Sequence, residues 1–112
     1  MKRRVVHRPV VTDALVVLGQ LVRQARATRG WTAEELARRA DVSPATISKI
    51  EAGAAGTAVG TVFNVADLVG VPIFGIGDRA ELARRRRLGE ETLALLPARV
   101  YHPRTSEPDD DF

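Results

Sequence analysis

The sequence predicts an all-α fold, in which several short helices enclose an aliphatic core. Hydrophobic residues make up 45% of the 112 residues but aromatic residues only 4%, so aliphatic side chains must fill the core. Leucine and alanine, which favour helices over strands, are abundant. Apolar residues also recur three and four positions apart, between helix start and stop signals. A chain of this length is expected to form one compact domain with short extensions.

The first predicted helix follows a basic N-terminal arm, residues 1–11. Pro9 is expected to prevent a helix from starting earlier. Thr12 or Asp13 is expected to cap the helix, and Gly30 to end it. Four apolar residues at helical spacing are expected to face the core: Leu18, Leu21, Val22 and Ala25.

A capping box opens the second predicted helix. The hydroxyl of Thr32 can accept a hydrogen bond at the helix start, and Glu35 stands at the third position after it. The helix is expected to end at Arg39 or Ala40, before a tight turn. Its inward residues are expected to be Leu36 and Ala37.

A second start signal opens a third helix directly after that turn. Ser43 is expected to be the cap and Pro44 the first helical residue, a position where an N–H group has no partner within the helix. The helix is expected to run to about Glu51, with Ile47 and Ile50 in the core. The side chains left facing outward are then Ala45, Thr46, Ser48 and Lys49.

A fourth helix is predicted over residues 58–69, ended by Gly70, and it completes a compact domain that spans residues 12–77. Residues 71–74 are expected to dock on the core, and residues 75–77 to form a flexible joint. The inward side chains of the fourth helix are expected to be Val62, Val65, Ala66 and Val69.

The C-terminal part is predicted to contain a fifth helix and a tail. Asp78 can cap the helix, which covers residues 78–96. Residues 97–112 are rich in proline and end in an acidic run, so this tail is expected to be extended or disordered when alone. The leucines of the fifth helix offer apolar surface for dimerisation: Leu82, Leu93, Leu95 and Leu96.

Charge is divided unevenly between the two halves of the chain. Residues 1–50 contain ten Lys and Arg and four Asp and Glu, a net charge of +6, whereas residues 51–112 carry −3. A basic half joined to an acidic half is typical of proteins that bind a polyanion, although ordinary solvated charge gives the same balance. Charge alone leaves these two interpretations even.

The residue types needed for most catalytic and metal sites are missing. Cysteine is absent, which excludes disulfides and thiolate ligands and fits a reducing cytoplasm. His7 and His102, the only histidines, are far apart, and no Ser/His/acid group, metal-ligand cluster or phosphate-binding glycine loop accompanies them. No apolar run is long enough for a membrane span or a signal peptide. We therefore expect no enzymatic activity, no cofactor and no membrane partner.

The two capped helices in the middle of the chain are typical of a helix-turn-helix, a unit that enters the major groove of DNA. The second of them exposes small and cationic side chains at its start, as a groove-reading helix must. Ala45 and the methyl group of Thr46 can meet thymine methyls, the Thr46 hydroxyl can bond a base, and Lys49 can reach guanine. Ser43 and the free N–H groups at both helix starts suit phosphate oxygens. The expected DNA-binding residues are Thr32, Arg38, Arg39, Ser43, Pro44, Ala45, Thr46, Ser48 and Lys49.

Two further features have both a structural and a functional interpretation. Trp31 is expected to pack at the helix junction rather than to stack on a base, because base stacking is a mode of single-strand recognition. Arg84–Arg87 circle the fifth helix, so they form a solvated face or, in part, a second DNA site.

Residues 19–71 resemble the lambda-repressor-like Cro/repressor (Xre-type) family of transcriptional regulators. The matching motifs include Glu-Leu-Ala at residues 35–37, Val-Ser at residues 42–43 and Thr-Ile-Ser-Lys-Ile-Glu at residues 46–51. The resemblance implies a five-helix bundle with a C-terminal extension, and binding to a double-stranded DNA operator as a homodimer.

The resemblance also implies an ion pair between Arg26 and Glu51 behind the DNA-binding surface. Ala33, Pro44 and Ala45 depart from the family, in which hydrogen-bonding side chains often stand at these positions. The departures leave open a non-catalytic adaptor, which would keep the fold and bind DNA weakly or not at all. The positive charge of the N-terminal half argues against the adaptor.

The C-terminal part resembles, over short motifs, the HipB-type antitoxin branch of the same family. It combines a basic helix, a Leu-Pro-x-Arg-Val segment at residues 96–100 and a terminal Asp-Asp-Phe. The resemblance implies that the tail binds a HipA-type kinase toxin and that the protein represses its own gene. The alternative is a disordered, solubilising tail. The expected partner-binding residues are Val100, Tyr101 and Phe112.

Overall fold

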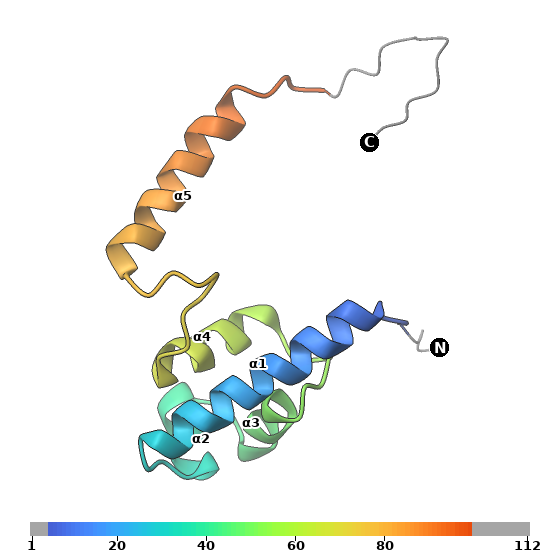
Figure 1. Cartoon of the computed structure of the whole chain (residues 1–112), viewed down its shortest axis with the longest axis vertical. Helices are drawn as coiled ribbons and strands as arrows, with labels where there is room; N and C mark the ends of the chain where they lie inside the picture. Colours follow the sequence, from blue (N-terminus) through green and yellow to red (C-terminus); the bar gives the residue numbers. More distant parts are fainter. Residues whose placement is uncertain (1–4, 100–112) are drawn as a thin grey trace. The chain divides into compact units, whose positions relative to one another are not determined.

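The computed structural model describes residues 5–99 and contains no strand within them, which confirms the predicted all-α fold (Figure 1). The chain divides into two units after Gly77; within the described residues, the first unit holds four helices and the second holds the fifth. None of these helices has the length and hydrophobicity that crossing a bilayer requires. In chain order they are α1 (Pro9–Thr28), α2 (Ala33–Ala40), α3 (Pro44–Glu51), α4 (Val59–Val69) and α5 (Arg79–Ala94).

The core of the first unit contains one completely buried side chain from each of its four helices. These side chains are Val22, Leu36, Ile47 and Val65, each 0% exposed. Burial of an aliphatic side chain of this size contributes about 1.5–3 kcal/mol, so this cluster ties α1 to α4 together. The inward faces predicted for α2, α3 and α4 are confirmed by the other buried residues, Ala37, Ala40, Ile50, Val62, Ala66 and Val69.

A side-chain cap begins α2 where the sequence predicts it. Oγ1 of Thr32 accepts a hydrogen bond from the backbone N–H of Glu35 at 3.0 Å. The carboxylate of Glu35 bonds Arg38 and Arg39 instead of returning to the cap, so only half of the predicted capping box forms. Asp41 ends α2 in the left-handed conformation, with φ at 58°, and turns the chain toward α3.

α1 begins at Pro9, one turn before the expected caps. The backbone C=O of Arg8 accepts hydrogen bonds from the N–H groups of Val11 and Thr12, at 2.9 and 3.2 Å. Proline fits the first helical position because an N–H group there has no partner within the helix. The expectation that Thr12 or Asp13 caps α1 is therefore wrong, and the last part of the expected arm is helical.

The inward face of α1 differs from the expected one at a single position. Val22 is fully buried, and Leu18 and Ala25 pack against the core around it. Leu21 was expected to point inward with them, and this is wrong, because it is 44% exposed. It lies on a second apolar stripe of α1, to which the core offers no cover.

The backbones of α1 and α3 come into direct contact at Gly19, which is buried. A Cβ atom at this position would lie 2.5 Å from the carbonyl oxygen of Ile50 and 2.6 Å from that of Glu51. Any larger residue would therefore push the end of α3 away from α1.

The segment after α4 docks on the core only in part. Val71 packs against the core as expected, whereas Phe74 is 79% exposed and does not dock. The N–H of Ile76 bonds the C=O of Ile73 at 3.0 Å, so a hydrogen-bonded turn stands where a flexible joint was expected to begin. Phe74, at the tip of this turn, meets the ring of Phe63 edge-on, with the centroids 5.8 Å apart.

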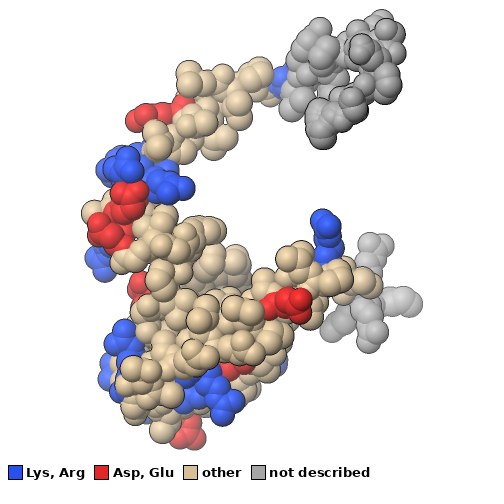
Figure 2. Space-filling view, in the orientation of Figure 1, with Lys and Arg blue, Asp and Glu red and all other residues tan. Residues whose placement is uncertain are grey.

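α5 has no buried residue along its length. Asp78 caps its start by accepting a backbone N–H from the first turn at 3.1 Å. Two ion pairs lie on its surface, Glu81–Arg84 at 2.9 Å and Arg86–Glu90 at 2.6 Å. The hydrogen bond from Arg84 holds the pKa of Glu81 below its ordinary value. Figure 2 shows the basic groups of α5 gathered between acidic ones.

Candidate nucleic-acid interface

The start of α3 is a small, uncharged surface whose direction is fixed by its cap. Oγ of Ser43 accepts a hydrogen bond from the backbone N–H of Thr46 at 3.2 Å and lies 3.1 Å from Oγ1 of Thr46. Pro44 occupies the first helical position, where its ring fixes φ. The first turn of α3 is therefore held by a side chain and by a ring together.

Four side chains of α3 are exposed on the side opposite the buried Ile47 and Ile50. Thr46, expected to face outward, is half-buried because its hydroxyl turns back toward Ser43. The two hydroxyl groups share one hydrogen bond, so one hydroxyl hydrogen of the pair stays free to donate. The exposed side chains are Pro44, Ala45, Ser48 and Lys49.

A shallow hollow lies where α1, the start of α2 and α3 meet. Arg23 of α1, Ala33 of α2 and Ser48 of α3 all contribute to its lining. The first N–H groups of α2 have no partners within the helix, and together with a guanidinium they favour a phosphate oxygen. The one carboxylate in the lining, that of Glu51, is paired with Arg26, so Arg23 leaves the lining with a net positive charge. This hollow therefore suits a phosphate group next to the exposed side of α3.

Arg23 is the site residue that the sequence reasoning missed. It stands three positions before Arg26, so the two residues share one side of α1. That spacing was the available signal, because the family resemblance already assigned Arg26 to the region behind the DNA surface. The sequence alone does not distinguish Arg23 from the other surface arginines, because only the fold places it beside the starts of α2 and α3.

Arg26 and Glu51, which also line the hollow, form an ion pair with two hydrogen bonds. Nε and Nη2 of Arg26 donate to the two carboxylate oxygens at 2.7 and 3.0 Å, and Nη1 donates to the C=O of Trp31 at 2.9 Å. The two side chains are only 15% and 10% exposed. The hydrogen bond with Glu51 raises the pKa of Arg26 above its ordinary value. The pair joins the end of α3 to α1 and to Trp31, the residue before the cap of α2.

The arginines of α2 are bonded to neighbouring side chains. Both donate to the carboxylate of Glu35, Arg39 at 2.7 Å. The guanidinium of Arg39 also lies over the ring of Trp31, 4.2 Å from its centroid. Trp31 packs against the core, which confirms the prediction that it is a packing residue. A phosphate contact by Arg38 or Arg39 must therefore compete with Glu35.

The sequence profile of a helix-turn-helix domain family matches residues 17–82, more than half of the chain. The match includes α2, α3 and the turn between them, which carry the exposed surface described above. The chain belongs to the helix-turn-helix domain family. No curated protein matches it significantly. The helix-turn-helix places the protein among DNA-binding regulators, a class that is typically non-enzymatic.

Within the helix-turn-helix, the residues predicted to contact DNA lie in three places. Thr32 stands at the start of α2, and the segment Ser43–Lys49 forms the start and exposed side of α3. Arg38 and Arg39 lie instead toward the end of α2. The residues expected to bind a partner protein, Val100, Tyr101 and Phe112, lie outside the described residues.

Proposed function

We propose that this helix-turn-helix protein is a sequence-specific DNA-binding regulator that represses transcription. α3 enters the major groove with its exposed side against the base edges, while Arg23 and the start of α2 contact the phosphate backbone. The observation that carries the proposal is the start of α3, a capped and narrow helix end. Every exposed side chain there is small or cationic, from Ser43 to Lys49.

Base recognition by this surface relies on apolar contact more than on hydrogen bonds. Pro44 and Ala45 carry no hydrogen-bonding side chain, and the Thr46 hydroxyl is bonded to Ser43. An exposed Ala45 can meet the methyl group of a thymine, and Lys49 can bond O6 and N7 of a guanine. We therefore expect half-sites in which a thymine methyl and a nearby guanine carry most of the preference.

The regulator acts as a homodimer on two half-sites about 34 Å apart, the spacing that a two-fold pair of such helices requires. α5 is one source of the dimer contact. Leu88 is 49% exposed, Leu93 65% and Leu95 85%. A single helix of this length is marginal in water, so α5 gains from a second copy that covers these leucines.

A more specific form of this function is the autorepressing antitoxin of a HipA-type kinase toxin. Its support is the sequence resemblance of the C-terminal part, together with a fifth helix that has no buried residue. Deletion of residues 108–112 should then weaken toxin binding and leave thermal stability and operator binding unchanged. Tighter operator binding with toxin binding intact would assign the tail a shielding role instead.

The competing function is a protein-binding adaptor that keeps the fold and binds DNA weakly or not at all. Ala33, Pro44 and Ala45 favour it, because the helix starts carry fewer hydrogen-bonding side chains than the resemblance leads one to expect. The two functions differ in one measurable quantity, the ratio between specific and random DNA affinity.

The test is selection of duplexes from a random library, followed by mobility shifts on selected and random DNA at several salt concentrations. Lys49→Ala should weaken binding to the selected duplex by about 1–3 kcal/mol and relax one base position. Arg87→Ala removes the same charge from α5 and should leave the base preference unchanged. Equal affinity of the wild type for selected and random duplexes would favour the adaptor.

Deoxyuridine provides a second test, because it differs from thymidine only by the missing methyl group. Replacing the critical thymine of the selected half-site should weaken wild-type binding several-fold, whereas Ala45→Gly should already have lost the sensitivity. If wild-type affinity is unchanged at every thymine, the apolar start of α3 does not read the bases.

A further inference from the structure

α1 has two apolar stripes, and only one of them faces the core. The stripe that contains Leu18, Val22 and Ala25 packs inside the first unit. The other stripe is exposed: Val10 is 65% exposed, Val17 51% and Leu21 44%, with the exposed Ala14 between them. We call these four residues (Val10, Ala14, Val17 and Leu21) the α1 seam.

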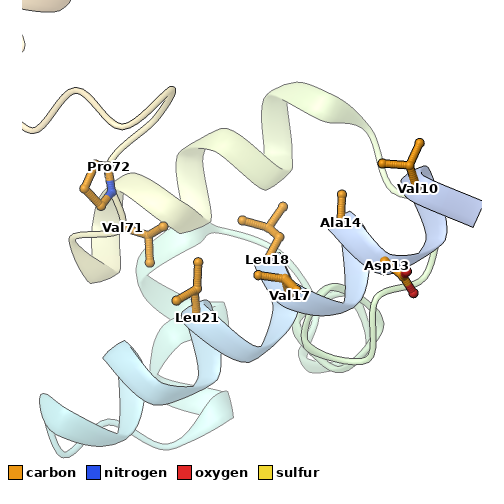
Figure 3. Close-up of a pocket in the computed structure, with 8 residues that line it drawn as sticks. All are labelled: Val10, Asp13, Ala14, Val17, Leu18, Leu21, Val71 and Pro72. Atoms are coloured by element: carbon orange, nitrogen blue, oxygen red, sulfur yellow. The ribbon is translucent and has the colours of Figure 1, made fainter.

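The α1 seam forms one side of a groove that the segment after α4 closes (Figure 3). Val71 and Pro72 form the other side, and the groove is open to solvent, with a volume of about 460 Å³. Asp13 is the only charged residue among those that line it. Figure 2 shows the surface over this part of α1 as largely uncharged. The groove therefore suits an apolar occupant and offers little to a phosphate or an acidic peptide.

The spacing of the seam is that of a helix which pairs with another helix. Its members are four, three and four positions apart, the heptad spacing of paired helices. The first half of α1 also carries apolar side chains on several other sides, with Val11 and Val16 37% and 38% exposed. A helix that is apolar nearly all round is normally buried, so this half of α1 lacks a cover.

We propose that the cover is a second copy of this chain, whose α1 packs antiparallel against the first along the α1 seam. An antiparallel two-fold places Val10 opposite the second copy's Leu21 and Ala14 opposite its Val17. Val10 then packs against Leu21, and Val17 packs against Ala14, whose small side chain lets the two helices approach closely. The pairing rests on the proposed function only in that a homodimer is the form that DNA binding needs.

Charge favours a second copy over the chain's own tail, and the size of the seam sets the strength of the contact. The C-terminal tail of this chain is acidic, and the only charge in the groove is the carboxylate of Asp13, so the two would repel. A seam of three helical turns buries less than the roughly 800 Å² per partner of a standard interface. The contact is therefore a weak one, which forms between free copies at tens of micromolar protein and is reinforced when two half-sites of DNA hold the copies at high local concentration.

The first experiment compares Val17→Glu on the seam with Thr12→Glu on the opposite side of α1, by sedimentation at tens of micromolar protein. Val17→Glu should weaken self-association about tenfold or more, the effect of losing one well-packed contact, while Thr12→Glu should match the wild type. Far-UV circular dichroism and melting temperature must stay at wild-type values in both, since both sites are exposed. Equal association of the two variants would overturn the proposal.

The second experiment uses the absence of cysteine from the chain, which makes introduced thiols unambiguous. A mixture of the single variants Val10→Cys and Leu21→Cys should form a disulfide-linked heterodimer under mild oxidation, because the antiparallel register brings those two positions within bonding range. Neither variant alone should cross-link comparably. Efficient cross-linking of Val10→Cys with itself would mean a parallel pair and would overturn the register.

Two further measurements test whether the chain's own tail covers the seam, and whether the seam can fail independently of the proposed function. If the chain's own residues 100–112 covered the seam, deleting them would increase self-association; the proposal expects no change. Val17→Glu should still bind an isolated half-site duplex like the wild type while losing cooperative binding to the full site. Loss of half-site binding by the wild type as well would contradict the proposed function and leave the sedimentation result standing.

Discussion

α2 and α5 have similar caps and surface ion pairs, but they differ in how much apolar surface they bury. Each starts with a polar cap, and each pairs glutamate with arginine on its surface. α2 nevertheless buries Leu36, Ala37 and Ala40, whereas α5 buries nothing. Caps and ion pairs contribute little to a helix compared with a buried face. Within the described residues, one of these helices is therefore stabilised by burial in its own unit, whereas the other has no such burial.

The largest expected difference between the two helices concerns their leucines. Leu36→Ala should destabilise the first unit by about 2–5 kcal/mol, because it leaves a cavity in a fully packed core. Leu93→Ala removes the same atoms from a side chain that is 65% exposed and should leave the unfolding free energy nearly unchanged. Urea denaturation at low protein concentration measures both. A loss of similar size in Leu93→Ala would show that α5 is already packed.

The next largest effect concerns the ion pair that anchors α3. Glu51→Ala should cost about 2–3 kcal/mol, since it leaves the guanidinium of Arg26 half-buried without its partner. Arg26→Met combined with Glu51→Leu should recover part of that loss. The surface pair of α5 offers the contrast, because Glu90→Ala should change stability by less than about 1 kcal/mol. A double-mutant cycle that gives additive losses for Arg26 and Glu51 would disprove their coupling.

A smaller effect separates the helix caps. Ser43→Ala should lower global stability by about 1 kcal/mol through the lost cap of α3, and it should also weaken operator binding. Asp78→Ala removes the corresponding cap of α5 and should reduce helical content without shifting the unfolding of the first unit. Ser43→Gly serves as a control, because glycine is nearly as good a cap residue as serine and should cost less.

The smallest effect is the pH dependence of α5. The pKa of Glu81 is lowered by the hydrogen bond from Arg84, so their pair supports the helix above the ordinary pKa of a glutamate. That support is lost as the pH falls through the lowered pKa, because the protonated carboxyl no longer attracts the guanidinium. Glu81→Gln should abolish this acid-dependent loss of helical content. If circular dichroism showed the same loss of helical content on acidification in the wild type and in Glu81→Gln, the assignment of this loss to Glu81 would be contradicted.

Sequence reasoning worked where one local interaction determines the structure. The caps at Thr32 and Ser43, and the buried faces that follow them, depend on hydroxyl groups and spacing within one turn. It failed at Pro9, because proline both excludes a helix upstream and suits the first position of one. It failed at Leu21 for a different reason. Helical spacing shows that a residue lies on an apolar face, but which of two such faces meets the core depends on the other helices.

The remaining errors concern contacts between distant segments. Phe74 sits in an apolar run that looked like a docking segment, but a left-handed turn carries its ring outward to Phe63. Arg23 became a site residue only once the starts of α2 and α3 were placed beside it. The sequence also did not show that Glu35 competes with DNA phosphates for Arg38 and Arg39, because all three residue types are common on the surface of a helix.

The position of Trp31 has a spectroscopic consequence. It is the only tryptophan in the chain, and it lies in the first unit, packed on the core beneath the guanidinium of Arg39. Its fluorescence therefore reports the melting of α1 to α4 and is blind to α5, whereas the amide signal in circular dichroism sums both units. The mismatch between the two melting curves isolates the transition of α5 without any label. Adding DNA or a second protein should then bring the curves together only if α5 has found its cover.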